Sequence, residues 1–266
     1  MTAADLIEGY LSHLRSESCS PNTIRDRRRT LTVLDAALPY GLDQATADEI
    51  KEWLWRDGLS ISSRETYYGA IAGFFRWAEA EERLDFNPAS CISRPKPPNR
   101  LPRPLSDDQL RQVLTQAVEP YRTWMLIAAY SGARCIEISR LHREHITKQT
   151  TILRGKGDKT RVVGTHPAMW DAVESMQPGP ITEHDPRFVS IRSAVYFSRT
   201  LHMPGVTLHR GRHWFGTMVQ RLYKDLRVTQ QAMGHADPRT TAGYALVVGE
   251  QVTEAVAMLP RLDLPE

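Results

Sequence analysis

The sequence lacks the features that mark membrane, secreted and disulfide-rich proteins. It holds no apolar run of about 18 residues, the length that a transmembrane helix needs. The first residues, Met1–Asp5, lack the basic and apolar regions of a signal peptide. The three cysteines, Cys19, Cys91 and Cys135, are odd in number and widely separated, so they form neither a disulfide framework nor a zinc motif. We therefore expect a cytoplasmic protein that binds no membrane.

The histidines do not supply a metal motif either. His142 and His145 are three residues apart, and His209 and His213 are four apart. Neither pair contains the glutamate of a His-Glu-x-x-His motif, and no cysteine pair lies nearby to complete a ligand set. The sequence therefore predicts no bound metal and no cofactor.

The net charge of +3 is modest, but it is unevenly distributed along the chain. Residues 1–95 carry a net charge of −4, and residues 96–266 carry +7. This asymmetry favours a polyanionic partner for the C-terminal part. Because many soluble domains show a similar imbalance, charge alone does not separate nucleic-acid binding from simple solubility.

Apolar side chains recur at helical spacing through residues 3–89, which predicts a compact region of four helices. The second helix is expected to begin at Ser20-Pro21, because serine caps a helix and proline fits its first turn. The third is expected at residues 47–55 and the fourth at residues 60–80. The fourth helix is expected to turn inward Tyr67, Ile71, Phe74, Phe75 and Ala78.

The clearest boundary is the segment of residues 94–104, which contains five prolines and four basic residues. Proline removes backbone donors and favours an extended path, so this segment is predicted to be a semi-rigid linker. Its charge suits a strap laid across phosphates, and equally a well-solvated connection. The predicted domains are therefore residues 1–93 and residues 105–266.

The second domain is predicted to open at Ser106, which forms a capping box with Gln109. A buried helix follows through Trp124 and Tyr130 and ends at Gly132. Two β-prone runs flank a turn at residues 155–159, which predicts a hairpin. Further helices are expected at residues 167–176, 188–200, 208–222 and 226–234, with a tail helix at about 250–260. The fold class is thus mainly α, with a small antiparallel β-sheet.

Six residues in order carry the chemistry of one anionic site: Arg134, Lys156, His209, Arg212, His235 and Tyr244. Cutting a phosphodiester without a metal requires cations on the non-bridging oxygens, a nucleophile, and a proton donor for the leaving alkoxide. Arginine suits the first task because its planar fork binds phosphate in bidentate fashion. Considered singly, Arg134 is more typical of a surface arginine paired with Glu137, and Tyr244 of a partly buried aromatic residue.

The contexts of these residues are unusual, and in them the chain resembles the tyrosine recombinases, the family of phage integrases and chromosome-dimer resolvases. The contexts are Ser131–Arg134 followed by Glu137, the turn Gly155–Lys159, the run His209–Thr217, and Met233–His235 nine residues before Tyr244. The resemblance runs from about Asp5 to the end of the chain. It implies a SAM-like core-binding domain of four helices, followed by an α-rich catalytic domain.

The resemblance also implies a role for each site residue. Arg134 and Arg212 clamp the phosphate, and Tyr244 attacks phosphorus to leave a 3′-phosphotyrosyl link and a free 5′ hydroxyl. Lys156 protonates the leaving oxygen, with Lys159 as the competing candidate on the same turn. The intermediate conserves the energy of the phosphodiester, so neither ATP nor a metal is required.

The remaining roles are less directly chemical. His209 is expected to be a general base or proton shuttle, and His235 to donate a hydrogen bond to a non-bridging oxygen. Glu137 and His213 are expected to support the site without performing chemistry. Arg161 is expected to contact the backbone or to pair with an acid.

The implied partner is double-stranded DNA, held in a C-shaped clamp by a homotetramer that joins two sites through a Holliday junction. Host or phage accessory and directionality factors, and association with the nucleoid, belong to the same expectation. The tail helix would dock on a neighbouring subunit, or alternatively on its own domain. Candidate DNA contacts are basic residues: Arg25, Arg28, Arg29, Arg64, Lys96, Arg100, Arg103 and Lys159.

Four functions remain open. The leading one is an integrase of a phage or mobile element, in a minimal form without an arm-binding domain, because Tyr223–Leu226 and Ala242–Tyr244 resemble such integrases. The second is a chromosome-dimer resolvase, and the third is a type IB-like topoisomerase. The fourth is a non-catalytic DNA-binding regulator, against which six intact site residues argue, since a binder needs no tyrosine there.

Overall fold

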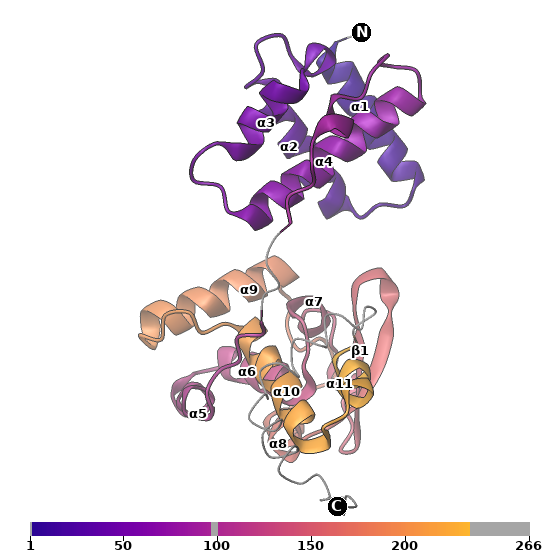
Figure 1. The fold of residues 1–266 in the computed structure, drawn as a ribbon. Helices are drawn as coiled ribbons and strands as arrows, with labels where there is room; N and C mark the ends of the chain where they lie inside the picture. The colour runs from indigo at the N-terminus through magenta and orange to yellow at the C-terminus, as the bar shows by residue number, and fades with distance from the viewer. Residues whose placement is uncertain (1, 97–100, 235–266) are drawn as a thin grey trace, which may run out of the picture. The chain divides into compact units, whose positions relative to one another are not determined.

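The computed structural model describes residues 2–96 and 101–234 and divides the chain into two compact units, Met1–Asn99 and Arg100–Glu266 (Figure 1). The division falls inside the proline-rich segment, and the domain bounds given above remain predictions. The predicted tail helix at about 250–260 lies outside the described residues. No helix within the described ranges is both long and apolar enough to cross a bilayer.

The first unit is built from four capped helices: α1 (Ala3–Ser16), α2 (Pro21–Asp35), α3 (Ala47–Trp55) and α4 (Ile61–Ala80). Each begins after a serine or threonine whose side chain accepts a hydrogen bond from the backbone of the first turn: Thr2, Ser20, Thr46 and Ser60. One short 3₁₀ turn, Leu42–Gln44, lies between α2 and α3, and another, Pro88–Cys91, comes after α4. The predicted starts of α2 and α3 are therefore confirmed.

The core of the first unit lies between these helices, as the periodicity predicted. Leu11, Leu34 and Leu54 from α1, α2 and α3 are completely buried. On α4 the expected inward residues Ile71, Phe74, Phe75 and Ala78 are buried, whereas Tyr67 is only half-buried. Tyr67 nevertheless packs against the core, with its ring 5.4 Å from that of Trp53.

The second unit is also mainly helical and carries one two-stranded sheet. Its helices are α5 (Asp107–Gln116), α6 (Tyr121–Ser131), α7 (Cys135–Ile138), α8 (Pro167–Val173), α9 (Pro186–Val195), α10 (Leu208–Tyr223) and α11 (Leu226–Met233). A π turn extends α9 over Tyr196–Thr200, and 3₁₀ turns lie at Arg143–His145 and Lys156–Asp158.

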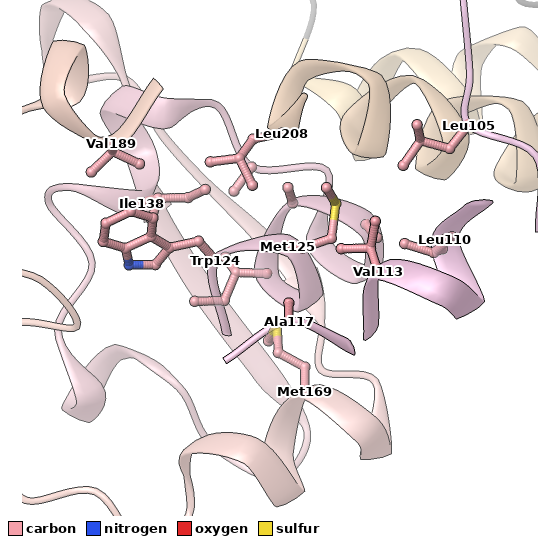
Figure 2. Packing of buried hydrophobic residues seen from close by; sticks show 14 of the residues in the cluster. Leu105, Leu110, Val113, Ala117, Trp124, Met125, Ile138, Met169, Val189 and Leu208 are labelled. Atoms are coloured by element: carbon pink, nitrogen blue, oxygen red, sulfur yellow. The ribbon is translucent and has the colours of Figure 1, made fainter. Parts of the chain in front are cut away.

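Helix α6 forms the centre of this unit. Its residues from Thr123 to Ala129 are all buried, and Figure 2 shows Trp124 and Met125 surrounded by side chains of α5, α7, α9 and α10. Gly211 allows α10 to approach α6 closely, because a Cβ there would lie 2.7 Å from Met125 Sδ. Helix α10, which carries His209 and Arg212, is therefore held directly against the buried helix α6.

The predicted hairpin is confirmed. Strands β1 (Thr150–Arg154) and β2 (Thr160–Gly164) pair antiparallel, with Arg154 opposite Thr160 at the turn. Gly157 has a φ of 68°, a left-handed conformation that glycine adopts without strain.

Two predicted helix boundaries were wrong. The helix predicted at residues 167–176 ends at Val173. The helix predicted to begin at residue 188 begins at Pro186, because the Asp185 carboxylate accepts hydrogen bonds from the backbone of Arg187 and Phe188 and so caps the helix earlier.

Candidate active site

A buried carboxylate, that of Glu137, organises the candidate site. Helix α7 begins directly after Arg134, whose backbone N–H donates to Glu137 Oε2 at 2.8 Å. The Arg134 side chain donates to Oε1 at 3.0 Å, and Arg161 of β2 donates to Oε2 at 2.9 Å. A third guanidinium, Arg212 of α10, lies 3.9 Å from Oε2. One carboxylate that is only 2 % exposed thus faces three arginines.

These contacts fix the charge of the site. Burial by itself raises the pKa of Glu137, but the hydrogen bond and charge of Arg161, the backbone of Arg134 and the charge of Arg212 outweigh it and hold the pKa below its usual value. The carboxylate is therefore ionised at neutral pH. With three guanidiniums against one carboxylate, the cluster retains an excess of about two positive charges, which is suited to a phosphate.

Arg212 is held almost completely out of solvent, at 2 % exposure. Its guanidinium donates to the carbonyl of Gly132 and, at 2.6 Å, to that of Met233. These carbonyls end helices α6 and α11, whose last groups have no partner within the helix. The arginine therefore ties two helix ends together, and its plane is fixed before any ligand arrives.

Arg161 performs a similar task from the sheet. It donates to the carbonyls of Ser131 at 3.2 Å and Gly132 at 2.9 Å, and also to that of Ala232. Gly234 lies directly against it, because a Cβ at Gly234 would approach Arg161 Cδ to 2.5 Å. Arg134 donates to the Gly234 carbonyl at 3.3 Å. The chain leaving α11 thus passes beside two of the arginines.

Two histidines lie on α10 beside Arg212. His209 and Arg212 are three residues apart and share one face of the helix. Loss of hydrating water lowers the pKa of His209, and the charges of Arg212 and Arg134 lower it further. Burial, His209 and two arginines lower the pKa of His213 to about 4. The two rings lie 4.4 Å apart, edge to face, and both are neutral at pH 7.

The hairpin turn approaches the same carboxylate. Gly155 accepts a hydrogen bond from Arg140 at 2.8 Å and donates one to the Lys159 carbonyl at 2.8 Å. A Cβ at Gly155 would lie 3.2 Å from Glu137 Oε1, so the backbone packs tightly against the cluster. Lys156 is the next residue, and its backbone therefore begins the turn beside Glu137.

Of the predicted site residues, Arg134, Glu137 and Arg212 come together in one cluster, with His209 and His213 on the helix that carries Arg212. His235 and Tyr244 lie outside the described residues. Arg161 is a member of the cluster that the prediction did not include, although its pairing with an acid was expected. Its place in β2 offered a signal, since alternation puts it on the buried face with Val163.

The candidate DNA contacts differ in their exposure. The exposed ones are Arg25, Arg29, Lys96, Arg103 and Lys159, and Arg100 lies outside the described residues. Arg28 pairs with Glu8.

Arg64 is a further candidate DNA contact. It is half-buried, and it donates to the carbonyls of Trp55 and Arg56 at the end of α3. Its guanidinium therefore caps a helix. In the part of the chain that the structure describes, no three His, Cys, Asp or Glu side chains gather to hold a metal.

Comparison with known proteins finds relatives that cover most of the chain. Residues 7–82 match the family described as "Phage integrase, N-terminal SAM-like domain". Tyrosine recombinase XerC of Pseudomonas aeruginosa (strain PAO1) is 31% identical over 274 residues, covering 91% of this chain and 89% of that protein. Tyrosine recombinase XerC of Pseudomonas savastanoi pv. phaseolicola is 28% identical over 268 residues, covering 90% of each.

The fold is likewise that of solved recombinases. A lambda integrase (75–356) dimer bound to a COC′ core site matches with a TM-score of 0.76 at 17% identity, covering 92% of this chain and 95% of that one. The XerH site-specific recombinase bound to palindromic difH substrate matches with a TM-score of 0.70 at 17% identity, covering 97% and 84%. The predicted fold class is confirmed, and the chain belongs to the tyrosine recombinase family of site-specific recombination enzymes.

Proposed function

We propose that this recombinase cuts and rejoins double-stranded DNA through a covalent bond to Tyr244, with the arginine cluster around Glu137 as its phosphate site. The observation that carries the proposal is the excess of positive charge around a buried carboxylate, three guanidiniums on one Glu137 side chain. A phosphodiester entering this site would supply the missing negative charge.

The arginines act first. Arg134, whose side chain is 38% exposed, and Arg212 hold the non-bridging oxygens of the scissile phosphate. Because Glu137 and the helix-end carbonyls already orient both groups, little reorganisation is needed as charge accumulates on those oxygens in the transition state. Glu137 positions the arginines without touching the substrate, and Arg161 locks the carboxylate from the other side.

Proton transfer follows from the lowered histidine pKa. Neutral His209 accepts the phenolic proton as Tyr244 attacks phosphorus, and the Tyr244 oxygen forms the new ester. Lys156 gives a proton to the 5′ oxygen as its bond to phosphorus breaks. His235 donates a hydrogen bond to a non-bridging oxygen, and His213 packs against His209. Rejoining is the reverse, so neither ATP nor a metal takes part.

The assembly and biological role are part of the same proposal. A homotetramer brings two DNA sites together and exchanges strands through a Holliday junction, as the lambda integrase tetramer bound to a Holliday junction suggests. We favour integration of a phage or mobile element, in the bacterial cytoplasm and with accessory factors. Chromosome-dimer resolution is the second candidate, and the identity to XerC proteins favours it.

Covalent capture tests the proposal. The protein is incubated with supercoiled genomic-library DNA in EDTA without ATP, denatured, and its linked DNA is sequenced. We expect adducts at one locus, joined through a 3′ phosphate, from the wild type and from Tyr223→Phe, which changes another tyrosine of the same unit that is 67% exposed. Tyr244→Phe should give none.

Three outcomes would change the conclusion. Adducts from Tyr244→Phe would exclude Tyr244 as the nucleophile. Adducts scattered without a preferred locus would favour topoisomerase-like action over site-specific exchange. Tight DNA binding by the wild type without any adduct would support the non-catalytic regulator.

A further inference from the structure

Beside the hairpin turn, the second unit contains an open pocket of about 690 Å³. It is separate from the Glu137 cluster and draws on three segments: the chain after α7, the 3₁₀ turn Arg143–His145 and the hairpin. Its lining residues are Ser139, Arg140, His142, His145, Arg154 and the Gly157–Asp158 part of the turn. This volume falls in the range of ordinary ligand sites.

The pocket is strongly basic. Arg140 and Arg154 line it together with two histidines, against a single carboxylate, that of Asp158. Within the described ranges Arg154 is exposed and makes no hydrogen bond or ion pair, whereas most arginines around it are engaged. Arg140 uses Nη1 to bind the Gly155 carbonyl at 2.8 Å. The pocket therefore presents two guanidiniums against the one carboxylate of its lining.

The histidines add a titratable component. The rings of His142 and His145 lie 5.4 Å apart, and His145 Nδ1 is buried without a hydrogen-bond partner among the described residues. Burial lowers the pKa of His145, and the charges of Arg154 and His142 lower it further, while Glu144 opposes them. An anion in the pocket would act with Glu144 and favour protonated imidazole.

We propose that this pocket binds a backbone phosphate of the DNA substrate, a contact separate from the scissile phosphate. The inference rests on the proposed function, because it takes DNA as the ligand. A phosphate there would be held by Arg154, Arg140 and the two imidazoles. The negative charge of Asp158 repels the phosphate and so limits the affinity of the pocket for it.

The placement suggests what the contact does. Arg140 holds the first residue of the turn by the Gly155 carbonyl, and Gly157 and Asp158 form the wall of the pocket. Lys156 lies between them in the chain. A phosphate bound in the pocket would therefore press the turn against the DNA and set the position of Lys156, a positioning effect distinct from its chemistry.

Salt dependence of DNA binding tests the proposal. Binding of a 30-base-pair duplex of arbitrary sequence is measured by fluorescence anisotropy between about 50 and 200 mM KCl. Loss of one phosphate contact lowers the log–log slope by about 0.9. We expect this decrease for Arg154→Gln and a rise in affinity for Asp158→Asn. Arg111→Gln, which removes an exposed arginine paired with Asp108 on α5, should leave the slope unchanged.

A second measurement uses pH. The proposal predicts that DNA affinity rises between pH 7.5 and pH 6.0, and that the substitution His145→Gln removes part of this rise. His209 and His213 are present in both proteins, so the comparison isolates the pocket. Arg140, Arg154, Glu144 and Asp158 are the fixed charges that face the pair.

The outcomes separate this inference from the proposed function. An unchanged slope for Arg154→Gln, or one that falls equally for Arg111→Gln, overturns the pocket contact even if the wild type forms its Tyr244 adduct. A wild type that forms no adduct overturns the catalytic proposal while the slope comparison still decides the pocket. The thermal midpoint of each variant shows whether it remains folded.

Discussion

Removal of the Glu137 charge tests whether this carboxylate holds the site together. The substitution Glu137→Gln keeps the shape of the side chain but leaves Arg134, Arg161 and Arg212 with no opposing charge. Removing one partner of a buried ion pair costs about 3–5 kcal/mol, because the remaining charge stays out of water. We expect a loss of that size in the stability of the second unit, since Glu137 is only 2 % exposed.

Hydrogen exchange followed by mass spectrometry suits the measurement, because peptides of α6 and α10 report opening of the second unit alone. Inorganic phosphate at about one hundred times its Kd should return about 2.7 kcal/mol to the variant, by binding the uncompensated arginines. The matched control is Asp108→Asn, whose carboxylate pairs with Arg111 but is 89% exposed and should lose little. A loss for Glu137→Gln no greater than that of the control would refute the argument.

Two further predictions concern neighbours of this cluster. The pKa of His213 falls from 6.5 to about 4 on folding, so the unfolded chain binds the proton first as the pH falls. The free energy of unfolding, measured with urea, should therefore decrease by about 3 kcal/mol between pH 6.5 and pH 4. His213→Gln should remove this component. Gly132→Ala should lower the free energy of unfolding by about 2–4 kcal/mol, because φ is +62° and a Cβ would lie 2.5 Å from Phe215 Cδ1. Gly58→Ala, with φ +81° and nothing within 4 Å, should cost only the backbone strain of about 1–2 kcal/mol. Equal losses by hydrogen exchange would refute the steric argument.

Local rules account for the parts of the fold that the sequence predicted well. The caps at Ser20 and Ser106, the end of α6 at Gly132 and the hairpin each depend on residues within a few positions of one another. The start of α9 also depends on a local rule, because the Asp185 cap lies directly before Pro186.

The site was harder to predict because its contacts join distant parts of the chain. Arg161 meets Glu137 across 24 residues and the Ala232 carbonyl across 71. No spacing rule connects such positions, so only its alternation within β2 offered a hint. The partners of Arg64 were also beyond any spacing rule, because it binds the carbonyls of Trp55 and Arg56 on the preceding helix end.

Arg161 and Arg212 use the same guanidiniums to bind helix ends and to form the proposed phosphate site. Arg161 and Arg212 bind the carbonyls that end α6 and α11, so the contacts that hold the unit together also fix the proposed phosphate site. Gly234 passes so close to Arg161 that only glycine fits, and His235 is the next residue. Tyr244 follows ten residues after Gly234, and an extended chain covers at most about 3.3–3.6 Å per residue. The chain between Gly234 and the proposed nucleophile therefore spans at most about 35 Å, which limits how far from the cluster Tyr244 can meet a phosphate.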